Sequence, residues 1–230
     1  MKFDENEFVE NPSVRLPVCL VLDTSSSMNA NNAILELNKG IKKLYNSIKK
    51  DEITRYSVEL SIVAFEFRKG KTYPKKILDF NTIDKQSIPQ LKAFGYTPLG
   101  GAVNLGLDLL EERKKLYQKN GISYYQPWLF LMTDGEPEKE LKEEIERATK
   151  RTKEMILDKK LTVYTIGMGE KANMQQLQDF TISRAPLKIT HTDLEIFFNW
   201  IAESMEKVSN SGDFLKSIDE NEYTSFEEGI

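Results

Sequence analysis

The sequence has 230 residues, of which 40% are apolar and 10% aromatic, and a formal net charge of −4. This length and composition allow one substantial hydrophobic core and are typical of a single α/β domain. The weakly acidic balance does not favour nucleic-acid binding, and no apolar run is long enough to span a membrane. The only histidine, His191, excludes a metal site built from several imidazoles.

The amino terminus and the single cysteine bear on the cellular compartment. Residues 1–13 are acidic and lack the positively charged start and apolar centre of a signal peptide. Cys19 lies inside an apolar run, which predicts a buried free thiol rather than a disulfide partner or a nucleophile. We therefore expect a cytoplasmic protein in which residues 1–13 form an N-terminal extension.

Strands and helices alternate along the chain. Apolar runs predict strands at residues 14–22, 55–67, 72–80, 161–169 and 187–190 and in the run that stops at Asp134. Apolar residues at helical spacing predict helices at 33–50, from Leu99 to Leu110, from Pro137 to Thr152, at 173–180 and from Leu194 to Val208. The alternation predicts an α/β fold, a doubly wound, mostly parallel sheet with helices on both faces.

One pair of strands departs from the parallel pattern. Residues 55–67 and 72–80 are separated only by a turn, which predicts an antiparallel hairpin. Pro74 cannot donate a hydrogen bond to a neighbouring strand, so the second strand suits a sheet edge.

The last twenty residues differ in composition from the rest. Residues 211–230 hold six acidic residues and one lysine. This charge run predicts a flexible, solvated C-terminal tail. A carboxylate-rich peptide that another protein binds is the alternative. The predicted domain then covers residues 14–210.

Oxygen-bearing side chains follow two of the predicted strands. Asp23 ends the first apolar run and opens the string "DTSSS", and Asp134 ends the later run "WLFLMTD". Ligands of open parallel sheets bind at the carboxyl ends of strands, and Thr97 reaches the same edge if its loop folds back. The candidate site is thus Asp23, Ser25, Ser27, Thr97 and Asp134. Oxygen-only ligands favour a hard cation such as Mg2+.

Helix capping is the competing interpretation of "DTSSS". Serine, aspartate and asparagine often cap helices, and a helix is predicted to begin soon after Ser27. The string alone leaves both interpretations open. Three separated segments that bring oxygen atoms to one sheet edge favour the metal site.

These stretches resemble a known family. "DTSSS" matches the D-x-S-x-S metal motif of the von Willebrand factor A (VWA) fold, and "GYTPLGGAV" and "FLMTDGEP" resemble its threonine and second aspartate segments. The resemblance covers roughly residues 14–208 and implies a Rossmann-like fold with a metal-ion-dependent adhesion site. "RLPVCLVLDTSSSM" and "FFNWIAESMEKVS" further resemble the bacterial tellurium-resistance (TerY-type) members. Ser26 replaces a glycine that is common in relatives.

The resemblance implies roles for the five residues. Ser25, Ser27 and Thr97 would bind Mg2+ directly, with Mn2+ or Ca2+ as alternative ions, and Asp23 and Asp134 would complete the site. An Asp or Glu of a protein partner would fill the remaining position. Phe94, Tyr96 and Met28 flank the site and are candidates for an apolar rim, with burial in the core as the alternative for Phe94.

The implied function is that of an interaction module without enzymatic activity. The TerY-type resemblance implies a bacterial stress or tellurium-resistance setting, with protein kinases or phosphatases as partners and with neither nucleic acid nor membrane. A phosphoryl-transfer enzyme that uses Asp23 is one alternative, although the second acid of a D-x-D motif is absent. A metal-free interaction module of the same fold is the other.

Overall fold

The computed structural model describes residues 11–182 and 184–228. Most of the expected N-terminal extension therefore lies outside the described residues. A six-stranded sheet in the order β3-β2-β1-β4-β5-β6 forms the centre of the fold. Its strands are β1 (Leu16–Leu22), β2 (Val58–Arg68), β3 (Lys71–Thr82), β4 (Trp128–Thr133), β5 (Thr162–Met168) and β6 (Leu187–Ile189).

All strand pairs are parallel except β2 with β3. The predicted doubly wound α/β fold with one antiparallel edge strand is confirmed. Pro74 lies in the edge strand β3, as its missing N–H donor predicts.

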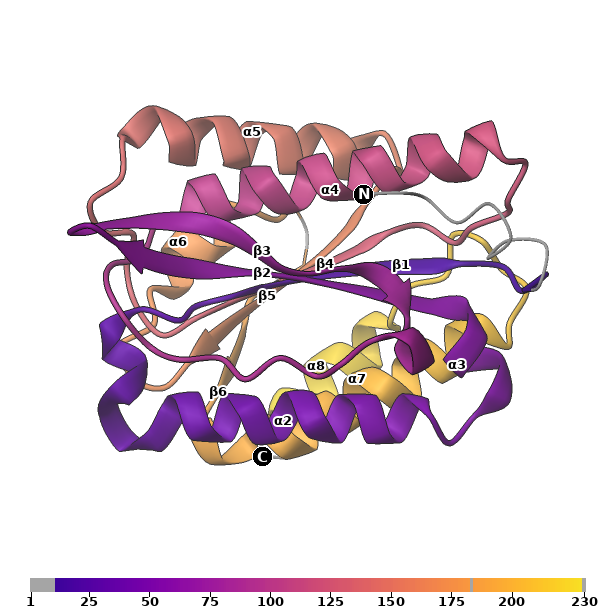
Figure 1. Cartoon of the computed structure of the whole chain (residues 1–230), viewed down its shortest axis with the longest axis horizontal. Coiled ribbons are helices and arrows are strands. Elements are labelled where there is room, and N and C mark those ends of the chain that lie inside the picture. Colours follow the sequence, from indigo (N-terminus) through magenta and orange to yellow (C-terminus); the bar gives the residue numbers. More distant parts are fainter. Residues whose placement is uncertain (1–10, 183, 229–230) are drawn as a thin grey trace.

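Helices cover both faces of the sheet (Figure 1). The helices are α2 (Ala33–Ile48), α3 (Glu52–Ser57), α4 (Leu99–Lys119), α5 (Lys142–Leu157), α6 (Met174–Gln178), α7 (Leu194–Ser209) and α8 (Glu220–Glu228), with short 3-10 turns η1 (Ser26–Asn32), η2 (Ile83–Lys85) and η3 (His191–Asp193). Within the described ranges, no helix combines the length and the apolar character needed to cross a membrane.

The two cores follow the alternation of side chains along the strands. In β1, Leu20 and its even-numbered neighbours pack with α2 and α7, whereas Cys19 and Val21 pack with α4. Cys19 is fully buried, and its burial raises the pKa of the thiol to about 12. The prediction of a buried free thiol is therefore confirmed.

The helix after β4 begins later than its sequence predicts. Helix α5 starts at Lys142, and Leu141, predicted on its inner face, is 70% exposed. Residues 134–141 instead form a loop that contacts the start of α4. The N–H group of Glu138 donates to the carbonyl oxygen of Thr97, and the Glu140 carboxylate accepts from backbone N–H groups of α4. These bonds hold the segment away from helical geometry.

The C-terminal segment also differs from the expectation. Ile218 and Tyr223 are 3% and 1% exposed and belong to the core on the α7 side of the sheet. The Tyr223 ring packs against that of Tyr164, and its hydroxyl donates to the carbonyl oxygen of Thr165. The expectation of a flexible tail is therefore corrected. Three apolar side chains of this acidic segment, Ile218, Tyr223 and Phe226, pack on the domain.

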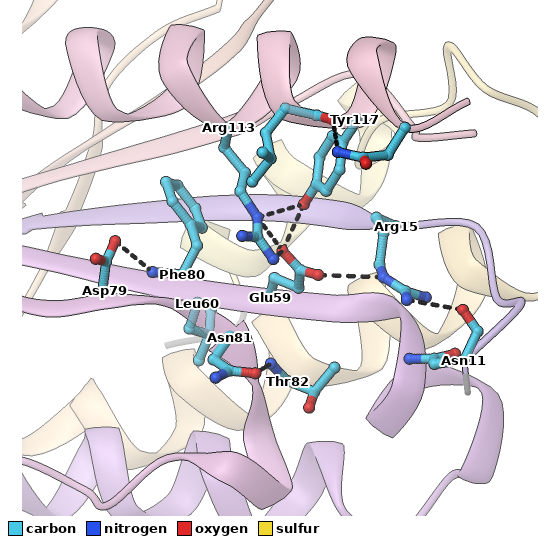
Figure 2. A network of polar contacts seen from close by, with 12 residues as sticks. Asn11, Arg15, Glu59, Leu60, Asp79, Phe80, Asn81, Thr82, Arg113 and Tyr117 are labelled. Atoms are coloured by element: carbon cyan, nitrogen blue, oxygen red, sulfur yellow. Dashed lines mark hydrogen bonds and ion pairs between the residues drawn. The ribbon is translucent and has the colours of Figure 1, made fainter. Parts of the chain in front are cut away.

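A buried ionic network lies at the amino-terminal ends of β1 and β2 (Figure 2). The Glu59 carboxylate pairs with Nε of Arg15 at 3.1 Å and with Nη2 of Arg113 at 2.6 Å. The Tyr117 hydroxyl donates to the same carboxylate at 2.5 Å. Glu59 and Arg15 are fully buried. The network ties α4 to the sheet at the end opposite to Asp23.

Candidate metal centre

The predicted site residues follow the two strands at which the sheet changes its winding direction. β1 lies between β2 and β4, so the connection after β1 leads to one side of the sheet and the one after β4 leads to the other. Loops diverge at such a point and leave room for a ligand. Asp23 directly follows β1 and Asp134 directly follows β4. The structure thus places both acids at the switch point.

A chain of hydrogen bonds joins the serines to the second acid. The Oγ atoms of Ser25 and Ser27 lie 2.7 Å apart, and Ser27 Oγ donates to Oδ1 of Asp134 at 2.8 Å. Ser25 adopts an extended backbone conformation before the turn η1. Residues 25 and 27 therefore present their hydroxyls to one place, although the chain enters the 3-10 turn at Ser26.

The capping interpretation of these serines finds no support in the hydrogen bonds. Ser25 is the N-cap residue of η1 and Asn32 that of α2, and neither side chain makes a capping bond. The carboxylate of Asp23 instead accepts from the N–H of Ser25 at 2.8 Å. Asp23 therefore shapes the loop, while the Ser27 hydroxyl donates to Asp134 and the Ser25 hydroxyl contacts that of Ser27.

Asp23 is 1% exposed and held at both oxygens. Oδ1 accepts from Ser25, and Oδ2 accepts from the Thr133 hydroxyl at 2.5 Å. Burial, followed by the nearby charge of Asp134, raises the pKa of Asp23 to about 6 despite these hydrogen bonds. Burial also raises the pKa of Asp134, which is 8% exposed. Two nearly buried carboxyl groups thus share one edge of the sheet.

Thr97 is brought to the same edge by its backbone. Its carbonyl oxygen accepts from the N–H of Glu138, four residues after Asp134. Two further bonds, Ser26 N–H to Gly95 O and Phe94 N–H to Thr24 O, join its loop to the "DTSSS" loop. Thr97 is 3% exposed, and in the described residues its hydroxyl makes no hydrogen bond. The structure therefore joins the three predicted segments, with the Thr97 hydroxyl outside the serine–aspartate chain.

The three candidate rim residues have different environments. Phe94 is 58% exposed, so the alternative prediction that its side chain is buried in the core is wrong. Tyr96 is half-buried, and Nζ of Lys139 lies 5.4 Å from its ring centre. Met28 is fully buried in the core beneath η1. The prediction of Met28 as a rim residue is therefore corrected.

Three residues that support the site were not predicted from the sequence. Thr133 is the last residue of β4 and donates to Asp23. The Thr24 hydroxyl accepts from the N–H of Phe65 at 2.9 Å, which ties the loop to β2. The Glu140 carboxylate accepts from the N–H groups of Gly100 and Gly101 at 2.8 and 2.6 Å. An acidic residue directly after an apolar run can be recognised in the sequence. The contacts of Thr133, Thr24 and Glu140 depend on how the loops fold, which no local sequence pattern indicates.

The donor set fits a hard cation and not a softer one. Within the described part of the chain, no group of three or more His, Cys, Asp or Glu side chains could hold a metal ion. A metal site here would therefore have to include the Ser and Thr hydroxyls. The candidate ligands are hydroxyl and carboxylate oxygens, which suit Mg2+, Mn2+ or Ca2+. Oxygen ligands around octahedral Mg2+ lie about 3 Å apart, given Mg–O distances of about 2.1 Å. The spacings of 2.7 and 2.8 Å from Ser25 through Ser27 to Asp134 are close to that value.

Comparison with known proteins places the fold in one family. Residues 18–195 match the family model described as "von Willebrand factor type A domain". An uncharacterized protein of Synechocystis sp., sll0103, is 27% identical over 193 residues, which are 80% of this chain and 41% of that protein.

Solved structures share the fold at low sequence identity. A von Willebrand factor type A protein from Catenulispora acidiphila has a TM-score of 0.61 at 16% identity, over 84% of this chain and 43% of that one. Manganese-loaded TRAP protein of Plasmodium vivax has a TM-score of 0.52 at 19% identity, over 80% of this chain and 73% of that one. The chain spans less than half the length of the Synechocystis and Catenulispora proteins.

Proposed function

Because the chain belongs to the von Willebrand factor type A family, we propose that it is an interaction module that binds Mg2+ and, through the ion, a carboxylate of a partner protein. The hydroxyls of Ser25, Ser27 and Thr97 would hold the ion, and Asp23 and Asp134 would complete the site. When bound, the ion supplies positive charge and a coordination position for an Asp or Glu of the partner.

The observation that carries this proposal is the chain of oxygens from Ser25 through Ser27 to Asp134 at the sheet's switch point. These atoms come from two loops that are 107 residues apart in the sequence. Their separations are ordinary hydrogen-bond lengths and are also close to the separation of neighbouring ligands around Mg2+. Local capping does not require a contact between such distant loops.

The burial of the two acids supports the same conclusion. Asp23 and Asp134 are 1% and 8% exposed. Neither makes a direct ion pair with another described residue, although the rise that burial causes in the pKa of Asp134 is partly offset by the charge of Lys171. Buried carboxylates in proteins are generally paired with a cationic side chain or coordinate a metal ion. A divalent cation would compensate both charges at once.

The identity of the ion is the finer part of the proposal. The manganese-loaded TRAP protein shares this fold and supports a divalent cation in general. We propose Mg2+ as the ion in the cell because the donors are oxygens only, with Mn2+ or Ca2+ as alternatives.

We propose that the module has no enzymatic activity of its own. The alternative is a phosphoryl-transfer enzyme that uses Asp23 as the nucleophile. A phosphatase assay with p-nitrophenyl phosphate and Mg2+ separates the two. Turnover that disappears in Asp23→Asn would support the enzyme.

The biological setting rests on the sequence resemblance. We propose a cytoplasmic, bacterial stress-response or tellurium-resistance protein, with kinase or phosphatase components as partners. Co-purification from cells with and without tellurite exposure, followed by identification of the bound proteins, tests this setting.

Titration calorimetry with MgCl2 tests the metal site. Wild type should bind Mg2+, and Asp23→Ala, Ser25→Ala and Ser27→Ala should each lose binding by tenfold or more, about 1.4 kcal/mol. Ser26→Ala is the matched control, because Ser26 is exposed and lies between the two proposed ligands. Wild type without measurable Mg2+ or Mn2+ binding would favour the metal-free module.

A further inference from the structure

The tip of the β2–β3 hairpin lies beside the candidate metal centre (Figure 1). β2 runs parallel to β1, so its carboxyl end is at the same edge as Asp23. The Tyr96 N–H donates to the Thr72 hydroxyl of β3 at 2.8 Å. Gly95 packs closely against Phe67, since a Cβ atom at Gly95 would lie 2.9 Å from its ring. The hairpin, the 94–96 loop and the "DTSSS" loop thus form one continuous surface.

Three aromatic side chains on this surface are exposed, and two of them lie next to Gly95 while the third, Tyr73 of β3, is 49% exposed. Phe67 of β2 and Phe94 of the loop are 46% and 58% exposed, and they flank Gly95. Most large apolar side chains of this fold are buried in the two cores. Exposed aromatic residues next to a binding site are typical of protein interfaces.

The hairpin tip also carries uncompensated positive charge. Arg68, Lys69 and Lys71 are exposed, and none of them forms an ion pair with another described residue. Lys75 and Lys76, further along β3, are paired with Glu66 and Asp79. The lysines further from the tip are therefore neutralised by ion pairs, whereas the three cations at the tip have no ion-pair partner among the described residues.

The register of the hairpin places two of these cations opposite each other. Arg68 and Lys71 are cross-strand partners on either side of the turn at Lys69 and Gly70. Like charges at directly opposite positions destabilise a strand pair. An anionic ligand at the tip would reduce this repulsion.

We propose that the hairpin tip selects a partner segment that carries further acidic residues and one apolar side chain beside its metal-binding carboxylate. This inference rests on the proposed function and adds the chemistry of the partner. Phe67 and Phe94 contact the apolar side chain, and Arg68, Lys69 and Lys71 attract the additional acids. Nucleic acid and anionic membranes offer phosphate groups, whereas an acidic protein segment is the occupant that matches the proposed contact between a carboxylate and the metal ion.

Fluorescence anisotropy with four short labelled peptides tests the inference. Each peptide holds one central Asp, flanked by Gly and Ser, by Glu, by Glu with one Phe, or by Lys. With Mg2+, the Glu–Phe peptide should bind about tenfold more tightly than the Gly–Ser peptide, and the Lys peptide most weakly. EDTA should abolish binding of all four.

Charge reversal at the tip provides the sharper comparison. The triple variant R68E/K69E/K71E should prefer the Lys peptide to the Glu peptides, whereas Phe94→Ser should lose only the advantage that Phe confers. The matched control is K49E/K50E/K119E, which changes the net charge equally at exposed positions at the opposite end of the molecule. This control should keep the wild-type order of affinities.

The outcomes separate the inference from the proposed function. Mg2+ binding by calorimetry without discrimination among the peptides overturns the hairpin inference and leaves the metal site standing. Absence of both Mg2+ and Mn2+ binding overturns the proposed function. Mg2+-independent binding of anionic vesicles or an oligonucleotide, lost in R68E/K69E/K71E, would assign the tip to a different class of partner and overturn the inference.

Discussion

Ser27 donates a hydrogen bond of 2.8 Å to Asp134, which lies 107 residues later in the sequence. This contact joins the loops after β1 and β4, the two strands that flank the switch point of the sheet. Three of the candidate metal ligands, Ser25, Ser27 and Asp134, are therefore joined by hydrogen bonds within the protein itself. Such an arrangement concentrates acidic groups, and its consequences for stability can be measured.

The first prediction concerns the pH dependence caused by Asp23. In the metal-free protein, the pKa of Asp23 is raised from 3.8 to about 6. The folded state then binds the proton more tightly than the unfolded state. The contribution of this group to stability is fully present below pH 3.8 and is lost as the pH rises through 6. Asp23→Asn should therefore stabilise the metal-free protein at pH 7 by about 1–3 kcal/mol and give no gain at pH 3.5.

Urea unfolding in EDTA at the two pH values measures this difference. Asp179→Asn, at an exposed position, serves as the control and should change little. Saturating Mg2+ should stabilise wild type and not Asp23→Asn, because only a bound ion shifts the unfolding equilibrium. A variant that is less stable than wild type at both pH values would contradict the raised pKa.

The second prediction concerns Glu140 as a support for the Thr97 loop. Its carboxylate accepts from the N–H groups of Gly100 and Gly101, which are free donors at the start of α4. Glu140→Ala should lower the free energy of unfolding by about 1–2 kcal/mol, the usual cost of a lost cap. Glu140→Gln should lose less, since one oxygen acceptor remains.

Mg2+ calorimetry and urea unfolding on the same samples check this role. We expect Glu140→Ala to weaken Mg2+ binding as well, because α4 begins two residues after Thr97. Glu138→Ala is the control, since the Glu138 side chain is exposed and only its backbone N–H contacts Thr97. Equal effects of the two alanine variants would argue against a specific role for Glu140.

The sequence predicts the sheet and the acids well, because both depend on strong local patterns. Continuous apolar runs mark β1 and β4 as strands with both faces covered, and the acid that ends each run is visible by inspection. The order of strands then places Asp23 and Asp134 at one edge. Family membership, the fold and the hairpin could all be predicted from these patterns. The metal-ligand roles and the tellurium-resistance setting stay predictions.

Other features depend on contacts that no local pattern encodes. Met28 lies near the site in sequence, yet the turn η1 directs its side chain into the core. Pro137 favours a helix start, but the contacts of Glu138 and Glu140 with the Thr97 loop delay α5 to Lys142. The acidic composition of the C-terminal segment hides Ile218 and Tyr223, which decide its position.

The third prediction concerns Glu59 at the far end of the sheet. Its carboxylate compensates both Arg15 and Arg113 (Figure 2). Glu59→Gln should lower the free energy of unfolding by about 3–5 kcal/mol, because two guanidinium groups would lose their buried counter-charge. Glu112→Gln, at an exposed position of α4, should change it by less than about 0.5 kcal/mol.

Metal binding separates this network from the candidate site. At a temperature where the Glu59→Gln variant is still folded, its Mg2+ affinity should equal that of wild type, because the network lies at the amino-terminal ends of the strands. A loss of Mg2+ binding in a folded Glu59→Gln variant would show that α4 couples the two ends.

The last prediction concerns the docking of the C-terminal segment through Tyr223. The Tyr223 ring is 1% exposed, lies 5.7 Å from the Tyr164 ring and is covered by the guanidinium group of Arg184 at 5.2 Å. Tyr223→Ala should lower the free energy of unfolding by about 3–5 kcal/mol, as for other buried aromatic residues. Tyr223→Phe should cost only about 1 kcal/mol, since it keeps the buried ring and removes the hydroxyl that donates to Thr165.

Urea unfolding of both variants and of Leu215→Ala measures these differences. Leu215 belongs to the same segment but is 57% exposed, so its truncation should change stability by less than about 0.5 kcal/mol. If Tyr223→Ala were as stable as Leu215→Ala, the segment would be detached in solution. The predicted order, with Tyr223→Ala far below the other two variants, requires that the segment after α7 be part of the folded domain.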